Sequence, residues 1–197
     1  MIAFVRELQR PVGPLRAFGA RGGPWDFHLR DVFRWCELVL AEQSAPHWRP
    51  EQFVDALFVQ RMRTEADRAA LLRLYASVMS AHAGGAALAA QPHYHVRAGS
   101  MQVGHAWLPR AGAPATARQP LQMLHAQLRP LQALMTCVRM RWMGIVSGDA
   151  GAGKTSAVRQ LAQLAGHRLQ EVVLSTATDT TELLGCFEQS EPSRLQL

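Results

Sequence analysis

The eight residues Gly148-Asp-Ala-Gly-Ala-Gly-Lys-Thr155 give the strongest structural signal in this sequence of 197 residues. They match the pattern G-x-x-x-x-G-K-[ST] at every fixed position, and the composition of the chain would produce such a match by chance with a probability of roughly 5 × 10⁻⁴. Lys154 is the only lysine of the chain. The pattern is typical of a phosphate-binding loop, or P-loop, that connects a β-strand to an α-helix. The alternative, a glycine-rich turn that binds nothing, agrees far less well with the complete motif.

The flanks of the loop have the order of elements that a P-loop requires. Residues 142–147 form a short apolar run, residues 154–165 have helical spacing before Gly166, and residues 169–174 form a second apolar run. Strand, loop, helix and strand in this order open a parallel sheet. The sequence therefore predicts the α/β class, with the first part of a P-loop αβα core.

The residue types in the loop suit a phosphate chain. Glycines at 148, 151 and 153 let successive backbone N–H groups point inward, and the following helix adds the positive end of its dipole. Lys154, also the candidate catalytic residue, is expected to reach the β- and γ-phosphates, and Thr155 to place its hydroxyl on Mg²⁺. The expected ligands are ATP and Mg²⁺. The predicted binding residues are Gly148, Asp149, Ala150, Gly151, Ala152, Gly153, Lys154, Thr155 and Ser156.

Hydrolysis of a bound nucleotide needs a further acidic residue at a strand end, which helps to hold Mg²⁺ and water. Between residues 169 and 197, no run of four apolar residues is followed by Asp or by Asp-Glu. Val172-Val-Leu-Ser175 continues into Thr176 instead. The sequence therefore predicts nucleotide binding without the acid that hydrolysis requires.

Helical spacing dominates the first part of the chain. Three amphipathic helices are predicted, over 27–40 with Asp26 as the N-cap, over 53–59, and from a capping sequence at Thr64 to Met79. Together they predict a small all-helical unit over residues 1–80.

A linker separates this helical unit from the P-loop part. Residues 81–92 are small and of low complexity, and residues 93–98 and 101–108 flank Gly99-Ser100 as the strands of a β-hairpin. Pro130 interrupts the helical spacing of 121–140, which predicts one helix that ends near Leu128 and another that starts at Pro130. The predicted division is a helical unit over 1–80, a linker with the hairpin over 81–119, and the start of the P-loop domain over 120–197.

Composition and charge argue against several classes of protein. With 48% hydrophobic and 18% charged residues, the chain has enough apolar material for a core, and no apolar run approaches the ~18 residues of a membrane span. The net charge is +6, but the arginines are scattered. We therefore expect no membrane contact and no direct sequence-specific binding of nucleic acid.

Cysteine and histidine give no metal site. Cys36, Cys137 and Cys186 are far apart and form no Cys-x-x-Cys pair, so the sequence encodes neither a zinc site nor a disulfide framework. The three histidines of the hairpin lack an evident fourth ligand, so a solvated strand face is favoured over a metal group. These histidines are His93, His95 and His105.

Four longer segments follow one another in a distinctive order. They are Pro24-Trp-Asp-Phe-His-Leu-Arg-Asp-Val-Phe-Arg-Trp-Cys-Glu-Leu38, Phe58-Val-Gln-Arg-Met-Arg-Thr-Glu-Ala-Asp-Arg68, residues 135–154, and Thr178-Asp-Thr-Thr-Glu-Leu-Leu-Gly-Cys-Phe-Glu-Gln189. Together they resemble the midasin family, the giant dynein-related AAA+ ATPases of ribosome assembly. The first two segments resemble signatures of a midasin AAA+ lid, and the other two resemble the approach to the next P-loop and the stretch after its second strand.

The resemblance implies that the chain contains parts of two successive AAA+ modules. Residues up to about 80 would be the lid of one AAA+ module, and residues from about 120 would open the next module. By this analogy Arg30 resembles the lid arginine that senses the nucleotide of the preceding module, so Arg30 and Lys154 would serve different nucleotides. The alternative for Arg30 is a helix-surface arginine paired with Asp26 or Asp31.

What the family does gives the functional expectation. In the family, ATP turnover in a ring of modules removes assembly factors from precursors of the large ribosomal subunit in the nucleolus and nucleoplasm. The partners implied are adjacent AAA+ modules, pre-ribosomal large-subunit particles and assembly factors, and the localisation implied is the nucleus.

Asp179 and Glu182 are expected to cap a helix rather than to form an acid and base pair.

Two alternative functions remain open. The chain could be a truncated, non-enzymatic interaction module whose lid docks onto neighbouring AAA+ subunits. A different P-loop class, such as a small-molecule kinase, is weakened because no lid or base motif follows the P-loop.

Overall fold

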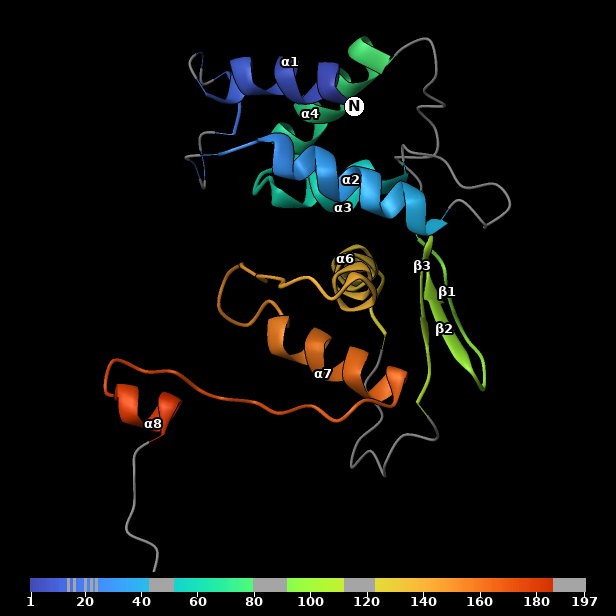
Figure 1. Ribbon diagram of the computed structural model, residues 1–197, viewed down its shortest axis with the longest axis vertical. Helices are drawn as coiled ribbons and strands as arrows, with labels where there is room; N and C mark the ends of the chain where they lie inside the picture. Colours follow the sequence, from blue (N-terminus) through green and yellow to red (C-terminus); the bar gives the residue numbers. More distant parts are fainter. Residues whose placement is uncertain are drawn as a thin grey trace, which may run out of the picture.

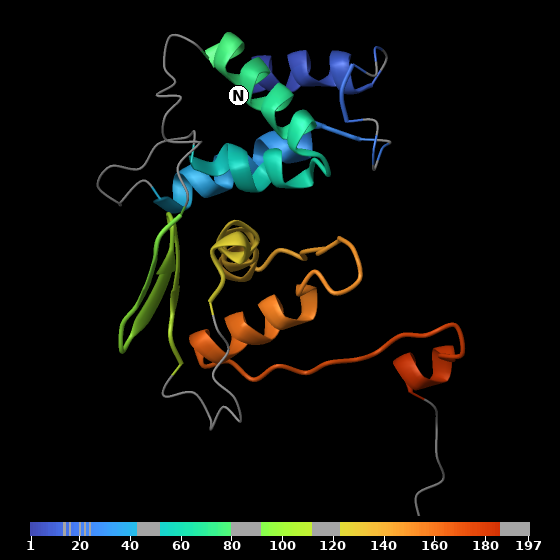
Figure 2. The ribbon, with the colours of Figure 1, turned by 180° about the vertical axis from the view of Figure 1, so that it is seen from behind.

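The structure, a computed structural model shown in Figure 1, describes residues 1–13, 15, 17–19, 21, 23, 25–42, 52–79, 92–111 and 123–185. Their elements are, in order, α1 (Ile2–Val12), α2 (Leu29–Glu42), α3 (Gln52–Leu57), the 3₁₀ helix η1 (Val59–Arg61), α4 (Glu65–Met79), β1 (Tyr94–Val96), β2 (Ser100–Val103), β3 (Ala106–Pro109), the 3₁₀ helix η2 (His125–Gln127), α6 (Leu128–Met140), α7 (Lys154–Ala165) and α8 (Thr180–Leu184). Helices α1 to α4 form one helical unit, and the strands pack with α6 and α7 as a second (Figures 1 and 2). Among the described residues, no helix is long and apolar enough to cross a membrane.

Aromatic side chains form the centre of the helical unit. Phe4 of α1 lies edge-on to Trp35 of α2, to Phe58 and to Tyr75 of α4, with ring centroids between 5.2 and 6.0 Å apart. All four side chains are fully buried. Edge-to-face packing adds to the stabilisation that burial gives to such rings. One apolar stripe of each helix therefore faces a common core.

Two features of the helical unit differ from the sequence-based expectations. Residues 2–12 form α1, a helix that was not predicted although its buried residues have helical spacing. Those residues are Phe4, Val5, Leu8 and Val12. Helix α2 starts at Leu29, because a carboxylate oxygen of Asp31 accepts a hydrogen bond from the backbone N–H of His28 at 2.9 Å. Asp26 is therefore not the N-cap.

The third predicted helix has the expected start. The hydroxyl oxygen of Thr64 accepts a hydrogen bond from the backbone N–H of Asp67 at 3.1 Å, which caps α4. The Asp67 carboxylate does not complete a reciprocal capping pair. It accepts instead from the backbone N–H of Gly19 at 2.8 Å and so fixes the loop after α1.

The predicted hairpin is present, but the sheet has three antiparallel strands in the order β1-β2-β3. The first turn lies around Gly99, as expected. The second turn, at Gly104 and His105, divides the segment 101–108 that was predicted as one strand. Gly104 has a φ of +57°, and a Cβ there would overlap Oε1 of Gln132. Glycine is therefore required at this turn.

The second core lies between this sheet and two helices. Alternate residues of β2 and β3 are buried and face α6 and α7, as the two-residue period of a strand requires. The buried residues are Met101, Val103, Ala106, Leu108, Leu128, Leu131, Met135, Leu161 and Ala165. Pro130 lies in the first turn of α6, two residues after the helix begins, where a missing N–H has no cost.

The predicted parallel sheet is absent from the described residues. Residues 142–149 and 167–175, which contain both predicted strands, run without a hydrogen-bonded neighbour strand, and the sheet that is present is antiparallel. Met143 and Ile145 are 95% and 96% exposed. A strand needs a partner, and these two segments do not pair with one another. Figures 1 and 2 both show the second segment leading away from the rest towards α8. The parallel P-loop core stays a prediction.

Candidate functional site

The P-loop enters α7 through two glycines with a left-handed backbone. Gly151 and Gly153 both have a φ of +79°, which residues with a Cβ rarely adopt. Gly153 is the N-cap of α7, and Lys154 is its first residue. A Cβ at Gly153 would also lie 2.7 Å from Nε2 of Gln127. Both the backbone conformation and the space around it therefore require glycine at 153.

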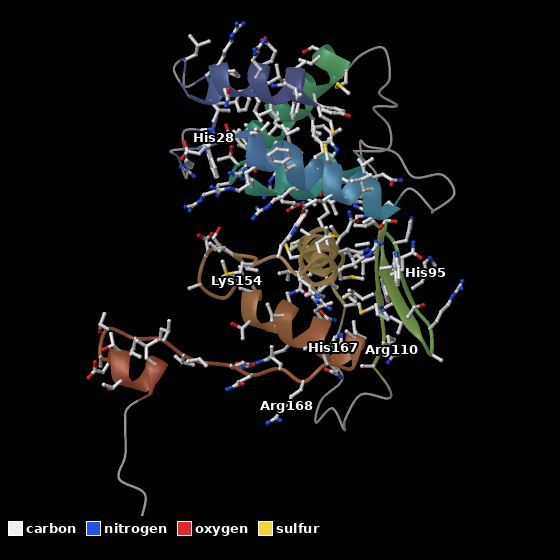
Figure 3. All side chains as sticks on the ribbon, in the orientation of Figure 1. His28, His95, Arg110, Lys154, His167 and Arg168 are labelled. Atoms are coloured by element: carbon white, nitrogen blue, oxygen red, sulfur yellow. The ribbon has the colours of Figure 1, made fainter. Side chains whose placement is uncertain are left out.

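Lys154 folds back over the loop at the start of α7 (Figure 3). Its Nζ donates hydrogen bonds to the carbonyl oxygens of Gly148 at 3.0 Å and of Asp149 at 2.7 Å. Thr155 and Ser156 follow in the first turn with exposed hydroxyls, where the backbone N–H groups have no partner within the helix. A charged phosphate is a stronger acceptor than a neutral carbonyl. The loop thus presents a cation, N–H donors and hydroxyls to an anionic ligand.

Helix α7 is fixed to the rest of its unit. Its buried face packs on the sheet and on α6, and Arg110 at the end of β3 holds its last turn. Nε of Arg110 donates to the carbonyl oxygen of Leu164 at 2.7 Å, and Nη1 donates to that of Arg97 at 2.8 Å (Figure 3). A cation at the carboxyl end of a helix also interacts favourably with the helix dipole. The N-terminus of α7, with Lys154, is therefore held on a packed base.

A cavity of about 740 Å³ lies between the P-loop and the helical unit. Ser147, Gly153 and Lys154 line it from the side of the loop. Five arginines line it from the helical unit, namely Arg30, Arg34, Arg61, Arg63 and Arg68. Its volume lies within the range of roughly 300 to 1,000 Å³ that is usual for small-molecule pockets. The structure therefore brings Arg30 and Lys154, to which the family resemblance assigns different nucleotides, to one cavity.

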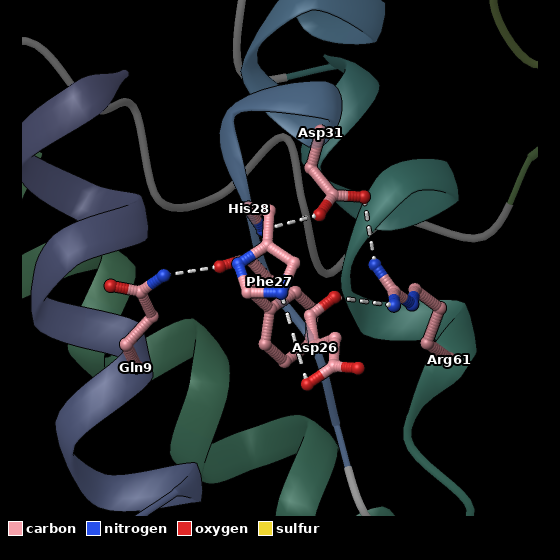
Figure 4. Close-up of polar contacts among 6 residues, drawn as sticks. All are labelled: Gln9, Asp26, Phe27, His28, Asp31 and Arg61. Carbon is pink, nitrogen blue, oxygen red and sulfur yellow. Dashed lines mark hydrogen bonds and ion pairs between the residues drawn. The ribbon is translucent and has the colours of Figure 1, made fainter.

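Two of the five arginines are held by other groups of the helical unit. Arg61 donates to Oδ1 of Asp31 at 2.9 Å and to the carbonyl oxygen of Asp26 at 3.2 Å, and its guanidinium lies 4.4 Å from the centroid of the Phe27 ring (Figure 4). Arg68 donates to the carbonyl oxygen of Met62 at 3.0 Å. These contacts fix the chain around the start of α2.

The other three arginines have no carboxylate partner among the described residues. Arg30 and Arg63 are exposed, and neither makes a hydrogen bond or ion pair within that part of the chain. The guanidinium of Arg34 lies 5.4 Å from the centroid of the Trp142 ring. Asp31 binds Arg61, and Asp26 lies 3.9 Å from His28. Arg30 is thus exposed on the surface of α2, as the alternative states, but within the described residues it pairs with neither Asp26 nor Asp31.

The solvated strand face predicted for the three hairpin histidines holds for His93 and His95 but not for His105, which is half-buried in the turn between β2 and β3. His93 and His95 are exposed beside the sheet, and no group of three metal-ligating side chains occurs among the described residues. His105 packs against Gln132 and the Phe53 ring, and burial lowers its pKa to about 4. Cys36 and Cys137 are free thiols, and burial raises the pKa of Cys137. Cys186 lies outside the described residues.

Asp179 and Glu182, which were predicted to cap a helix, are described in part. Oδ1 of Asp179 accepts from the backbone N–H of Thr180 at 2.6 Å at the start of α8. The hydroxyl of Thr180 donates to the same oxygen at 3.1 Å, and this hydrogen bond, together with that from the backbone, lowers the pKa of Asp179. The side chain of Glu182 lies outside the described part. Asp179 therefore has the capping role that the sequence predicts.

Three residues near the P-loop or its cavity were not predicted from the sequence. Arg34 could have been found from its spacing, since residues four apart on α2 place it on the same face as Arg30. Neither Arg63 nor Gln127 could be predicted from a local pattern. Arg63 reaches the cavity through the packing of the two units, and Gln127 reaches Gly153 through the packing of α6 on α7.

Comparison with known proteins supports a specific relationship. Residues 1–82 match the family model described as the midasin AAA lid domain. The whole chain is 34% identical to a segment of midasin from Dictyostelium discoideum, of which it covers 4%, and 96% of the chain is 28% identical to a segment of midasin from Giardia intestinalis, of which it also covers 4%. The chain thus spans only a small part of the length of these curated relatives.

Proposed function

Because the chain is recognisable along its whole length as a midasin-family segment, we propose that it is a nucleotide-binding segment of a midasin-like AAA+ ATPase that holds ATP and Mg²⁺ at residues 148–156. The observation that carries the proposal is the loop itself. A complete P-loop motif precedes α7, and two of its glycines have a left-handed backbone conformation. Its single lysine donates hydrogen bonds to two carbonyl oxygens of the loop.

Phosphate binding would replace the internal contacts of Lys154 within the loop. Nζ of Lys154 exchanges the carbonyl oxygens of Gly148 and Asp149 for phosphate oxygens, which are charged and therefore stronger acceptors. The N–H groups at the start of α7 and the positive end of its dipole stabilise the same charge. The hydroxyl of Thr155 is the protein ligand that this loop provides for Mg²⁺, which also neutralises part of the phosphate charge.

We propose further that this segment binds ATP without hydrolysing it. The sequence after α7 has no acid at a strand end, and residues 142–149 and 167–175 form no sheet within the described part of the chain. The acid and the neighbouring strands of a parallel P-loop core would come from other parts of a midasin-like protein. Turnover is therefore a property of the assembled module.

The wider role follows from the family resemblance. In this proposal the segment works beside adjacent AAA+ modules, on pre-ribosomal large-subunit particles and their assembly factors, in the nucleolus and nucleoplasm. The match of residues 1–82 to the midasin AAA lid domain and the matches of 100% and 96% of the chain to segments of two midasins support it.

Titration of the purified chain with a fluorescent ATP analogue in the presence of Mg²⁺ tests the binding step. Lys154→Ala is expected to weaken binding by at least about tenfold, because it removes a charge-assisted contact to phosphate. Arg73→Ala is the matched control, since Arg73 is an exposed cation of α4 that does not line the cavity. Equal binding by Lys154→Ala and by the unchanged chain would contradict ATP binding at the loop and favour the non-enzymatic interaction module.

A phosphate-release assay on the same samples tests the proposal that the chain does not hydrolyse ATP. We expect no turnover by the chain on its own. Sustained ATP hydrolysis that disappears in Lys154→Ala would show that the chain contains its own catalytic acid.

A further inference from the structure

The two edges of the three-stranded sheet differ in their capacity to pair with another strand. β1 and β3 lie on either side of β2. At the β3 edge, the backbone N–H of Arg110 donates to the carbonyl oxygen of Gly99, so the backbone positions that face away from β2 are those of Trp107 and Pro109. Pro109 has no N–H to offer there, and a proline on an edge strand opposes the addition of a further strand.

The β1 edge keeps all its backbone groups. The N–H of Arg97 donates to the carbonyl oxygen of Ser100 at 2.8 Å. Because hydrogen-bonded and non-hydrogen-bonded pairs alternate along an antiparallel ladder, the N–H and C=O groups of Tyr94 and Val96 point away from β2. Among the described residues no strand lies beside this edge. β1 is therefore the edge at which an added strand finds both donors and acceptors.

One face of β1 continues the apolar side of the sheet. Tyr94 lies opposite Val103 and Val96 lies opposite Met101, so both belong to the face that packs on α6 and α7. Val103 and Met101 are each 1% exposed, whereas Tyr94 and Val96 are 45% and 41% exposed. The apolar face thus extends by one strand beyond the helices that cover it in the described part of the chain.

The other face of β1 is basic. His95 lies opposite Gln102 on the solvent side, and His93 and Arg97 share this side by the two-residue period of the strand. All three side chains are exposed. Residues 92–111 contain two arginines and three histidines, but no aspartate or glutamate. A strand beside β1 would therefore meet a cation and imidazoles on one face and apolar side chains on the other.

We propose that β1 is a docking edge for an extended acidic segment of another polypeptide, which adds to the sheet as an antiparallel fourth strand. Acidic residues of that segment lie beside His95 and Arg97, and the apolar residues between them cover Tyr94 and Val96. In such complexes the backbone hydrogen bonds supply affinity and the alternating side chains supply specificity. The inference concerns the hairpin and does not depend on nucleotide binding at the P-loop.

Fluorescence polarisation with a labelled peptide of about seven residues, the length of an ordinary strand, tests the docking edge. The peptide alternates glutamate and valine, and it is expected to bind the purified chain. Its valine amides face β1 in the antiparallel arrangement, so N-methylation of the valines is expected to weaken binding at least about tenfold. N-methylation of the glutamates, whose amides face away, is the matched control. Equal binding by both methylated forms and the unmodified peptide would overturn strand addition.

Substitutions in β1 test the same edge from the side of the protein. Val96→Pro removes an N–H that β2 does not use and is expected to weaken binding at least about threefold, whereas Val96→Thr keeps this N–H and should bind nearly normally. Far-UV circular dichroism checks that both variants are folded. The methylated peptides leave the protein unchanged, so they decide the matter if Val96→Pro does not fold.

A charge exchange tests the acidic character of the partner. Arg97→Glu is expected to bind the glutamate and valine peptide about threefold more weakly, and to bind a lysine and valine peptide better than the unchanged chain does. Arg73→Glu reverses the same charge at an exposed position of α4 and is the control. Equal effects of the two substitutions, or equal binding of both peptides by the unchanged chain, would overturn the proposed chemistry.

The remaining outcomes also decide between occupants. Analytical ultracentrifugation shows whether the chain associates with itself. Self-association that Val96→Pro abolishes would identify a second copy as the occupant of the edge and overturn the acidic partner. Failure of the chain to bind ATP would contradict the proposed function and leave peptide binding unaffected, so the two proposals fail separately.

Discussion

At the scale of single residues, His105 couples the stability of the fold to pH. It lies in the turn between β2 and β3, where Nδ1 is 3.0 Å from Nε2 of Gln132 and the ring packs edge-on against Phe53 of α3. Burial lowers its pKa from 6.5 to about 4, so the folded chain holds it neutral at pH 7. The unfolded chain takes up the proton first, and stability is lost as the pH falls from about 6.5 through about 4.

Urea unfolding at pH 7 and pH 5 measures this loss. Linkage between the two pKa values of His105 gives a decrease of about 2 kcal/mol in the free energy of unfolding at pH 5. His105→Leu is expected to remove this part of the pH dependence. His95→Leu, at an exposed position of β1, is expected to retain it. The same pH dependence in both variants would show that His105 is not its source.

Some residues of the site could be predicted from the pattern of the residues next to them in the sequence, and others could not. The loop from Gly148 to Ser156 could be predicted, because a phosphate-binding turn needs its glycines, lysine and hydroxyls at fixed spacing. The position of Arg30 across the cavity from Lys154 could not, since it depends on how the helical unit packs over the loop. Burial of His105 likewise follows from its contacts with Gln132 and Phe53, which are distant in sequence.

At the scale of elements, α6 ends in a conformation that its sequence does not favour. Arg141 has a φ of +55°, and among the described residues it alone has a positive φ without being glycine. The backbone N–H of Trp142 donates to the carbonyl oxygen of Cys137 at 2.8 Å and so closes the last turn. Glycine is the residue that best fits this position after a helix.

Arg141→Gly is therefore expected to raise the free energy of unfolding by roughly 0.5 to 1 kcal/mol, because the relief of the left-handed backbone exceeds the added entropy of the unfolded chain. Arg141 is exposed and makes no side-chain hydrogen bond or ion pair within the described residues, so the substitution removes little else. Arg141→Ala keeps the strained backbone and should change stability by less than about 0.5 kcal/mol. Thermal or urea unfolding compares the two, and equal effects would exclude a backbone cause.

Helix α4 was easier to predict than the strands of the parallel sheet for a physical reason. A helix such as α4 satisfies its own backbone, so its apolar period and its capping Thr64 are visible in a single segment. The segments 142–147 and 169–174 are apolar enough for buried strands, but a strand exists only beside another. Their apolar side chains, including Ile145 and Val173, are instead exposed in the described chain.

At the scale of the whole molecule, the helical unit and the P-loop unit contact each other chiefly through α6. Arg139 near the end of α6 forms an ion pair with Glu42 of α2, and its guanidinium lies 4.6 Å from the centroid of the Trp107 ring of β3. Met140 and Trp142 also pack on the core of the helical unit. One segment thus joins both cores and borders the cavity that holds Lys154.

The ion pair between Glu42 and Arg139 permits a test of this connection. Both side chains are largely buried, at 11% and 20% exposed, and burial lowers the pKa of Arg139. Removal of one partner leaves a buried charge without compensation, so Glu42→Ala is expected to lower the free energy of unfolding by about 2 to 4 kcal/mol. Adding Arg139→Met should restore part of that loss, because the neutral side chain keeps the packing of the arginine stem. Glu37→Ala, at an exposed position of the same helix, is the control and should change stability by less than about 0.5 kcal/mol. A double variant that is less stable than Glu42→Ala in urea unfolding would show that Arg139 stabilises the joint through Trp107 rather than through the ion pair.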